Sequence, residues 1–226
     1  LRKLKRKTEV DWPRHRDIGN YEPNMIFLLT PPNSGSTAIA QVFLSSPYVS
    51  QLQSRGEGQW LIKGLCGDDR WREDKVVDAR SIRSGWIRAS YKKYKRNGSL
   101  YFIEKSPPNM MRIETLQSIF PSHLLLANNR DPYANISSMF YRYTKDIDKL
   151  NTNEREVAIT RLAEAWLKRS YVLRKIIQSQ GVPYLSYERF CENPTLLQEI
   201  VDSSLFNGRI KLDFKKNLNV KDYEPQ

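Results

Sequence analysis

The chain has 226 residues, a length that fits one large domain or a domain with an appendage. Its 39% of hydrophobic residues is ordinary for a soluble globular protein, and no apolar run approaches the roughly 20 residues that a membrane helix needs. The formal net charge of +12 predicts an anionic partner, with mere solubility as the alternative. Two cysteines, Cys66 and Cys191, offer neither a disulfide framework nor metal-ligand spacing. This usage favours a reducing compartment, so we expect a cytoplasmic protein unless a signal or anchor before Leu1 has been removed.

The order of the predicted elements indicates an α/β fold. Residues 1–24 carry the basic cluster LRKLKRK, and we expect an N-terminal arm there and a single α/β domain over residues 25–226. The pattern predicts strands at 25–30, 101–103, 124–127 and 182–186, a loop at 51–69, and helices at 37–46, 71–95, 110–120, 132–143, 154–180 and 194–205. Strands that alternate with helices predict a P-loop-like central parallel sheet with helices on both faces.

A short polar loop, residues 31–37 (PPNSGST), separates the first predicted strand from the first predicted helix. A glycine-containing turn at a helix N-terminus attracts anions, because free backbone N–H groups and the helix dipole both favour negative charge there. The hydroxyls of Ser34, Ser36 and Thr37 add donors. We therefore expect a phosphorylated ligand at this loop, although the Gly-Lys-Ser/Thr of an ATP-binding P-loop is absent.

Two other predicted strands also end in polar segments, residues 104–109 (EKSPPN) and 128–132 (NNRDP). Ligands of open α/β sheets bind beyond the carboxyl ends of the strands, so these segments and the first loop are expected at one crevice. Lys105 and Arg130 then face the same space as two helix N-termini. Such an arrangement suits a ligand that carries several phosphates.

Together these segments resemble the sulfotransferases that depend on 3′-phosphoadenylyl sulfate (PAPS). Residues 33–37 resemble the family's 5′-phosphosulfate loop, and Arg130-Asp131-Pro132 with Ser138 resembles its 3′-phosphate site. Three more segments resemble the tyrosylprotein-sulfotransferase-like branch: 55–57 (RGE), 104–107 (EKSP), and 187–188 (YE) followed by 193–194 (NP). Each motif alone is weak, but the five occur in the family's order over residues 25–197.

The resemblance implies transfer of a sulfuryl group from PAPS to a hydroxyl-bearing acceptor, with 3′,5′-bisphosphoadenosine (PAP) as product and no metal. It leaves the acceptor open among small molecules, glycans and peptides, and it implies no specific nucleic-acid partner. The nucleotide-binding residues that it implies are Asn33, Ser34, Gly35, Ser36, Thr37, Arg130, Ser138 and Tyr187.

The acceptor must lose a proton, so a general base is expected near the sulfur. His15 lies in the predicted arm and His123 at the opposite edge of the sheet, which favours a carboxylate. Glu57 lies between glycines and matches the family's glutamate, so it is the candidate base, against the alternative of a solvated loop residue. We expect Lys105 to donate to the bridging oxygen or the sulfuryl group, the alternative being a surface lysine.

One position departs from the family pattern, because Asn33 stands where the loop usually has Lys or Arg. Either Lys105 and a neighbour such as Arg55 compensate, or the chain is a slow or inactive PAPS-binding or anion-binding module. Two other functions stay open. One is a kinase with an unusual loop, and the other is a nucleic-acid-binding module whose affinity would fall steeply with salt.

Overall fold

The protein is described by a computed structural model that covers residues 18–215. The strands of this part are β1 (Asn24–Leu29), β2 (Val49–Gln51), β3 (Tyr101–Glu104) and β4 (His123–Ala127). They form one sheet in the order β2-β3-β1-β4, and all neighbouring strands pair in parallel. Because β1 and β3 are neighbours and β4 flanks β1, the segments that follow these three strands emerge at the same edge of the sheet.

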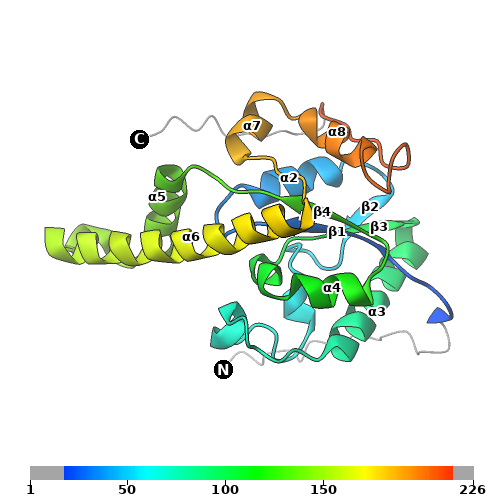
Figure 1. Cartoon of the computed structure of the whole chain (residues 1–226), viewed down its shortest axis with the longest axis horizontal. Helices are drawn as coiled ribbons and strands as arrows, with labels where there is room; N and C mark the ends of the chain where they lie inside the picture. Colours follow the sequence, from blue (N-terminus) through cyan, green and yellow to red (C-terminus); the bar gives the residue numbers. More distant parts are fainter. Residues whose placement is uncertain (1–17, 216–226) are drawn as a thin grey trace, which may run out of the picture.

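Helices cover both faces of this sheet (Figure 1). The α-helices of the described part are α2 (Ser36–Phe43), α3 (Ala79–Asn97), α4 (Ile113–Ile119), α5 (Pro132–Tyr143), α6 (Thr152–Gln180), α7 (Tyr187–Glu192) and α8 (Leu196–Asp202). The short 3₁₀ helices are η1 (Gly58–Leu61), η2 (Asp68–Trp71), η3 (Pro107–Arg112) and η4 (Ile147–Lys149). In Figure 1, α3 and α4 lie below the sheet and α2, α7 and α8 lie above it. The prediction of a parallel α/β fold with helices on both faces is confirmed.

Alternation along β1 divides the core between the two faces of the sheet. Met25, Phe27 and Leu29 belong to the cluster that includes residues of α3 and α4, whereas Ile26 and Leu28 belong to the cluster that includes residues of α2 and α8. All five side chains are fully or almost fully buried. A central parallel strand is covered on both faces, which is why this segment is a continuous apolar run rather than an alternating one.

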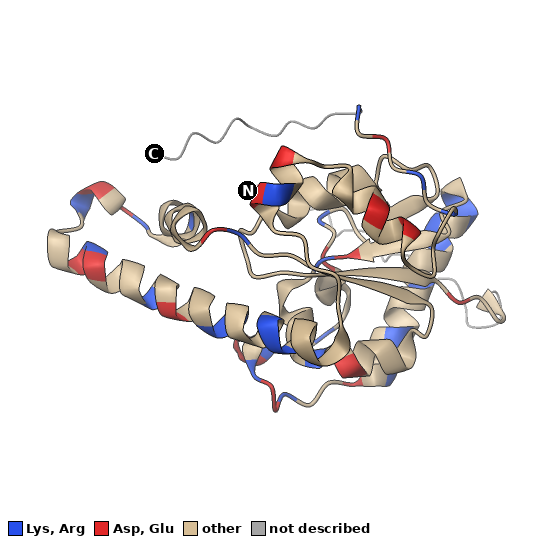
Figure 2. Cartoon of the chain, turned by 45° about the horizontal axis from the view of Figure 1, so that its top comes forward, with Lys and Arg blue, Asp and Glu red and all other residues tan. Residues whose placement is uncertain are grey.

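The long helix α6 runs beyond the sheet, and α5 packs against it (Figure 1). Acidic and basic side chains are mixed in the first half of α6, whereas the charged residues after Glu164 are all basic (Figure 2). Asn151 and Glu154 begin this helix with reciprocal side-chain-to-backbone hydrogen bonds, a capping box. Among the described residues, no helix has both the length and the apolar character needed to cross a membrane.

Two element predictions are wrong in detail. The helix predicted from residue 71 begins only at Ala79, because Asp78 caps it by accepting a hydrogen bond from the backbone of Arg80. The strand predicted at 182–186 is reduced to a single bridge between Tyr184 and Ala127. The chain leaves the sheet there because the Ser186 side chain caps α7.

The sequence pattern did not predict β2 or α7, which are only three and six residues long. The predicted loop at 51–69 contains η1 and η2, and the helix predicted at 110–120 is divided into η3 and α4. Most of the predicted N-terminal arm lies outside the described residues. Within the arm's described part, Ile18 is buried and Asn24 already begins β1.

Candidate functional site

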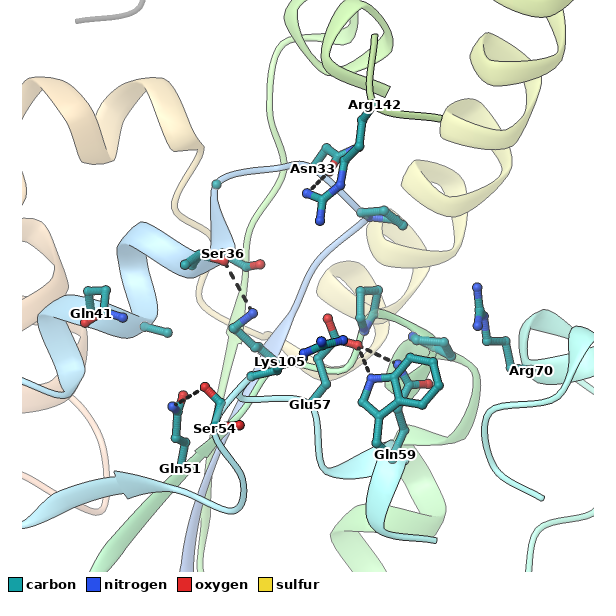
Figure 3. A pocket seen from close by; sticks show the side chains of 18 of the residues that line it. Asn33, Ser36, Gln41, Gln51, Ser54, Glu57, Gln59, Arg70, Lys105 and Arg142 are labelled. Atoms are coloured by element: carbon teal, nitrogen blue, oxygen red, sulfur yellow. Dashed lines mark hydrogen bonds between the residues drawn. The ribbon is translucent and has the colours of Figure 1, made fainter. Parts of the chain in front are cut away.

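A pocket of about 620 Å³ opens where the segments after β1 and β3 meet (Figure 3). The predicted site residues that line it are Asn33, Gly35, Ser36, Thr37, Glu57 and Lys105. Ser34 is buried beneath this surface. Arg130, Ser138 and Tyr187 do not line the pocket, and the contacts of Arg130 and Tyr187 place them around the loop that forms one of its walls.

That loop, residues 31–37, is called here the anion loop. Its backbone turns through the left-handed region at Asn33 (φ 59°) and Gly35 (φ 81°), and α2 begins at Ser36 directly afterwards. No side chain caps the N-terminus of α2. The Ala38 backbone N–H bonds to the Gly35 carbonyl oxygen, and the N–H groups of Ser36 and Thr37 are the ones that can bind an anion. The loop therefore has the backbone geometry that an anion site needs, and anion binding there stays a prediction.

Two asparagines hold the anion loop in place from other parts of the fold. Asn135 of α5 donates from Nδ2 to the carbonyl oxygen of Pro32 at 2.9 Å and to Ser34 Oγ at 3.0 Å. Ser34 Oγ in turn donates to Asn129 Oδ1, after β4, at 3.4 Å. Both Ser34 and Asn135 are fully buried. The Ser34 hydroxyl thus ties the loop to α5 and to the end of β4.

Tyr187 and Arg130 lie against the other side of the anion loop. A Cβ atom at Gly35 would lie only 2.0 Å from Cδ2 of the Tyr187 ring, so only glycine leaves room for the ring there. The Arg130 guanidinium carbon is 5.3 Å from the centre of the same ring. Arg130 also donates from Nη1 to the carbonyl oxygen of Asn33 at 3.5 Å. The predicted 3′-phosphate residue and the predicted tyrosine therefore form one cluster with the loop.

Ser138 is half-buried on α5. Residues three, four and seven positions apart share one face of a helix, so Ser138 lies between Asn135 and Arg142 on the face that contacts the anion loop. Ser138 is therefore expected close to the anion loop, although it does not line the pocket.

The segment that carries Glu57, residues 55–59, is called the glutamate segment and is bonded to the end of β3. The buried Glu104 carboxylate accepts hydrogen bonds from the backbone N–H groups of Gly58 at 2.5 Å and Ser106 at 2.9 Å. Ser106 Oγ accepts from the Gln59 backbone at 3.2 Å, and Lys105 donates its backbone N–H to Gly56 at 3.0 Å. This network fixes the position of Glu57 relative to Lys105, the residue that directly follows β3.

Glu57 and Lys105 both face the pocket (Figure 3). Glu57 Oε2 accepts hydrogen bonds from Gln59 Nε2 at 2.7 Å and Trp60 Nε1 at 3.1 Å, which orient the carboxylate. Lys105 Nζ approaches Thr37 Oγ1 at 3.4 Å. Burial lowers the pKa of Lys105, the negative charges of Glu57 and Glu104 oppose this shift, and Arg142 reinforces it.

Sequence reasoning missed one basic residue beside the anion loop. Arg142, in the last turn of α5, donates from Nη1 to Asn33 Oδ1 at 3.2 Å and lines the pocket. Arg142 follows Ser138 by four residues and so shares its face of the helix, which is the sequence signal that could have identified Arg142. Arg70, Trp60, Trp71 and Tyr143 also line the pocket. They were not named as site residues, although they lie in the segments 51–72 and 143–153, where we expect acceptor specificity.

The residues present fit a phosphosulfate group. The Nδ2 atom of Asn33 is buried and has no hydrogen-bond partner among the described residues, so a bound anion would supply the missing acceptor. The first turn of α2, Lys105 and Arg142 add donors around the same pocket.

The contact between Gly35 and Tyr187 predicts unequal effects of two glycine substitutions. Gly98 has the same left-handed backbone (φ 73°) but open space around it. Gly98→Ala should therefore cost about 1 kcal/mol of unfolding free energy from backbone strain alone. Gly35→Ala should cost clearly more, because Tyr187 must also move. Urea unfolding of both variants checks this, and equal losses would contradict the packing described.

The buried Glu104 predicts a pH dependence of stability. Burial raises the pKa of this carboxyl from 4.5 to about 7, while hydrogen bonds from Ser106 and Gly58 limit the rise. Between these values the folded chain keeps a proton that the unfolded chain releases. The free energy of unfolding should therefore fall as pH rises from 4.5 to 7, by up to about 3 kcal/mol.

Unfolding by urea at several pH values measures this dependence, with Glu104→Gln as the non-titrating comparison. The slope between pH 4.5 and 7 should be shallower in the variant than in the natural chain. Parallel pH profiles would show that Glu104 does not cause the dependence.

The chain is similar to known sulfotransferases in sequence pattern and in fold. Solved structures with this fold include a sulfotransferase from Mycobacterium avium (TM-score 0.56, 13% identity, 84% of this chain and 65% of that chain covered). Another is from Alicyclobacillus acidocaldarius (TM-score 0.52, 14% identity, 86% and 83% covered). A third is a mouse sulfotransferase complexed with PAP (TM-score 0.51, 14% identity, 88% and 65% covered).

The chain thus spans less than two thirds of the length of the mycobacterial and mouse structures. No curated protein sequence is significantly similar to it. The model of the sulfotransferase family matches residues 23–200, well over half of the sequence and all of the site described above. The chain belongs to the sulfotransferase family.

Proposed function

We propose that this protein transfers a sulfuryl group from PAPS to a hydroxyl-bearing acceptor. The observation that carries the proposal is that the Glu57 carboxylate, the Lys105 ammonium and the N-terminus of α2 all face one pocket. A base, a cation and an anion site in one cavity are the groups that in-line transfer of a charged group needs.

The anion loop is the proposed site of the nucleotide's 5′-phosphate. Backbone N–H groups of residues 34–37 and the hydroxyls of Ser36 and Thr37 would donate to it. Arg130 and Ser138 are the proposed ligands of the 3′-phosphate, because a guanidinium can hold a terminal phosphate through two parallel hydrogen bonds. The Arg130–Tyr187 cluster against Gly35 supports a place for the nucleotide along this side of the loop.

The proposed reaction forms a bond from the acceptor oxygen to sulfur as the bond from sulfur to the 5′-phosphate oxygen breaks. Glu57 accepts the acceptor's proton, and its hydrogen bonds from Gln59 and Trp60 hold the carboxylate in position. The electron pair of the broken bond stays on the phosphate oxygen. Lys105 stabilises that growing negative charge, from a largely buried position where electrostatic interactions are stronger than in water.

In this proposal the remaining walls of the pocket contact the acceptor. Trp60, Trp71 and Tyr143 offer flat apolar surfaces, and Arg70 adds a positive charge. These residues support a hydroxyl-bearing acceptor with one apolar face, and they leave small molecules, glycans and peptides as candidates.

Asn33 supports a second candidate function, a PAPS-binding protein that transfers slowly or not at all. The loop itself carries no cation at the position where the family usually has one. Nucleotide binding without turnover, across a wide panel of acceptors, would favour this candidate.

Two substitutions separate binding from chemistry. Glu57→Gln should leave PAP affinity within about twofold but reduce turnover by roughly 10²- to 10⁴-fold, since only proton transfer is lost. Arg130→Ala should weaken PAP binding by about 10-fold or more, because a phosphate loses a charged donor. Calorimetric titration with PAP and PAPS consumption in the presence of phenols, glycans and peptides measure both effects.

Matched controls are Glu156→Gln and Arg161→Ala, which alter exposed residues of α6 away from the pocket. Both should behave as the natural chain does. Full turnover by Glu57→Gln would remove Glu57 as the base, and unchanged PAP binding by Arg130→Ala would remove Arg130 from the nucleotide site.

A further inference from the structure

The pocket contains a basic side chain that is well placed to replace the cation missing from the anion loop. Asn33 is the neutral residue at the loop position where the family resemblance implies Lys or Arg. Arg142 reaches the same point from a different element, and Figure 3 shows its guanidinium directed at the Asn33 side chain. Nη1 of Arg142 and Oδ1 of Asn33 are 3.2 Å apart, although 109 residues separate them in sequence.

The position of Arg142 is supported by the rest of α5. Asn135, seven residues earlier on the same face of the helix, is fully buried and bonded to Pro32 and Ser34 of the anion loop. The face of α5 that ends in Arg142 is thus attached to the loop at a second point. The guanidinium carbon also lies 5.7 Å from the centre of the Tyr143 ring, which limits its orientation further.

Asn33 itself is suited to receive this arginine. Its left-handed backbone (φ 59°) is a conformation that asparagine tolerates better than most residues. Its side-chain oxygen accepts the hydrogen bond from Arg142, and its buried Nδ2 has no partner among the described residues. The neutral asparagine side chain at position 33 accepts a hydrogen bond from the guanidinium of Arg142, whereas a lysine or arginine at position 33 would repel that guanidinium.

The other basic residues of the pocket fit the role less well. Arg55 and Arg142 are both exposed, but Arg55 donates a hydrogen bond from its backbone N–H to Gln53, whereas Arg142 donates from its guanidinium to the anion loop. Arg70 lies on the far side of the pocket from Asn33 (Figure 3). Among the described residues, Arg142 is the arginine that lines this pocket and also donates to the anion loop's side chain at position 33.

We propose that Arg142 is a catalytic residue, which supplies from α5 the positive charge that the anion loop lacks at position 33. It contacts the sulfuryl oxygens, and Lys105 contacts the bridging oxygen from the other side. When the acceptor oxygen bonds to sulfur and the pair of the broken bond moves to the phosphate oxygen, the two cations share the negative charge. A guanidinium has two or more N–H groups to offer, so one can bind Asn33 while another binds the sulfuryl group. This inference rests on the proposed function.

The test compares binding of PAPS with binding of PAP, because the two ligands differ only in the sulfuryl group. Calorimetric titration of Arg142→Ala and Arg142→Gln should show PAPS affinity reduced by about 10-fold and PAP affinity changed by no more than about twofold. Arg142→Gln keeps a donor to Asn33 but removes the charge, so it separates charge from hydrogen bonding. Arg161→Ala on α6 is the matched control and should bind both ligands normally.

Turnover and rescue complete the test. Conversion of PAPS to PAP in the presence of the hydroxyl-bearing acceptors should fall by roughly 10²-fold or more in both Arg142 variants. Adding Asn33→Lys to Arg142→Ala places the cation in the loop and should recover part of the lost PAPS affinity and rate. PAP binding by every variant shows that it is folded.

The outcomes distinguish this inference from the proposed function. If the natural chain binds neither PAP nor PAPS, the proposed function fails. If it binds and turns over PAPS, but Arg142→Gln keeps the natural ratio of PAPS to PAP affinity, the inference fails and the function stands. Equal weakening of both ligands would also overturn it, because Arg142 would then act on the phosphates or on the fold.

Discussion

A buried carboxylate holds the candidate site together. Glu104, at the end of β3, accepts backbone hydrogen bonds from Gly58 and Ser106 and a side-chain bond from Asn109 at 3.1 Å. A backbone N–H left without a partner in this buried position would cost about 1–3 kcal/mol, so the glutamate segment cannot easily leave the strand end. The positions of Glu57 and Lys105 relative to each other follow from this one attachment.

A second attachment places the anion loop opposite the glutamate segment. Asn135 binds the loop from α5, and Tyr187 packs on Gly35 from the start of α7. Three chain segments that follow β1, β3 and β4 therefore converge because the strands are parallel neighbours and the loops are bonded across them. The proposed chemistry uses this arrangement directly, since in-line transfer depends on fixed positions more than on any special reactivity.

Local sequence signals predicted the parts of the fold that are long or strongly patterned. The apolar run of β1 and the start of α5 at Pro132 are visible within a few residues of sequence, and the long helix α6 was predicted from residue 154, two residues after its observed start at Thr152. The three-residue strand β2 carries too few residues for a periodicity. Contacts such as Arg142 to Asn33, or Glu104 to Gly58, join residues 109 and 46 positions apart, and no local pattern encodes them. The motifs therefore indicated which loops form the site, while the pairing of side chains within it required the fold.

The central claim is that the anion loop and its neighbours form a site for a nucleotide with phosphates at both the 3′ and 5′ positions. Calorimetric titration of the protein with PAP, with ATP and AMP as comparisons, tests it most directly. We expect selective binding of PAP. Unfolding measured with PAP at 100 times its dissociation constant should also show a gain of about 2.7 kcal/mol in the free energy of unfolding. Absence of PAP binding, or a preference for ATP, would contradict it.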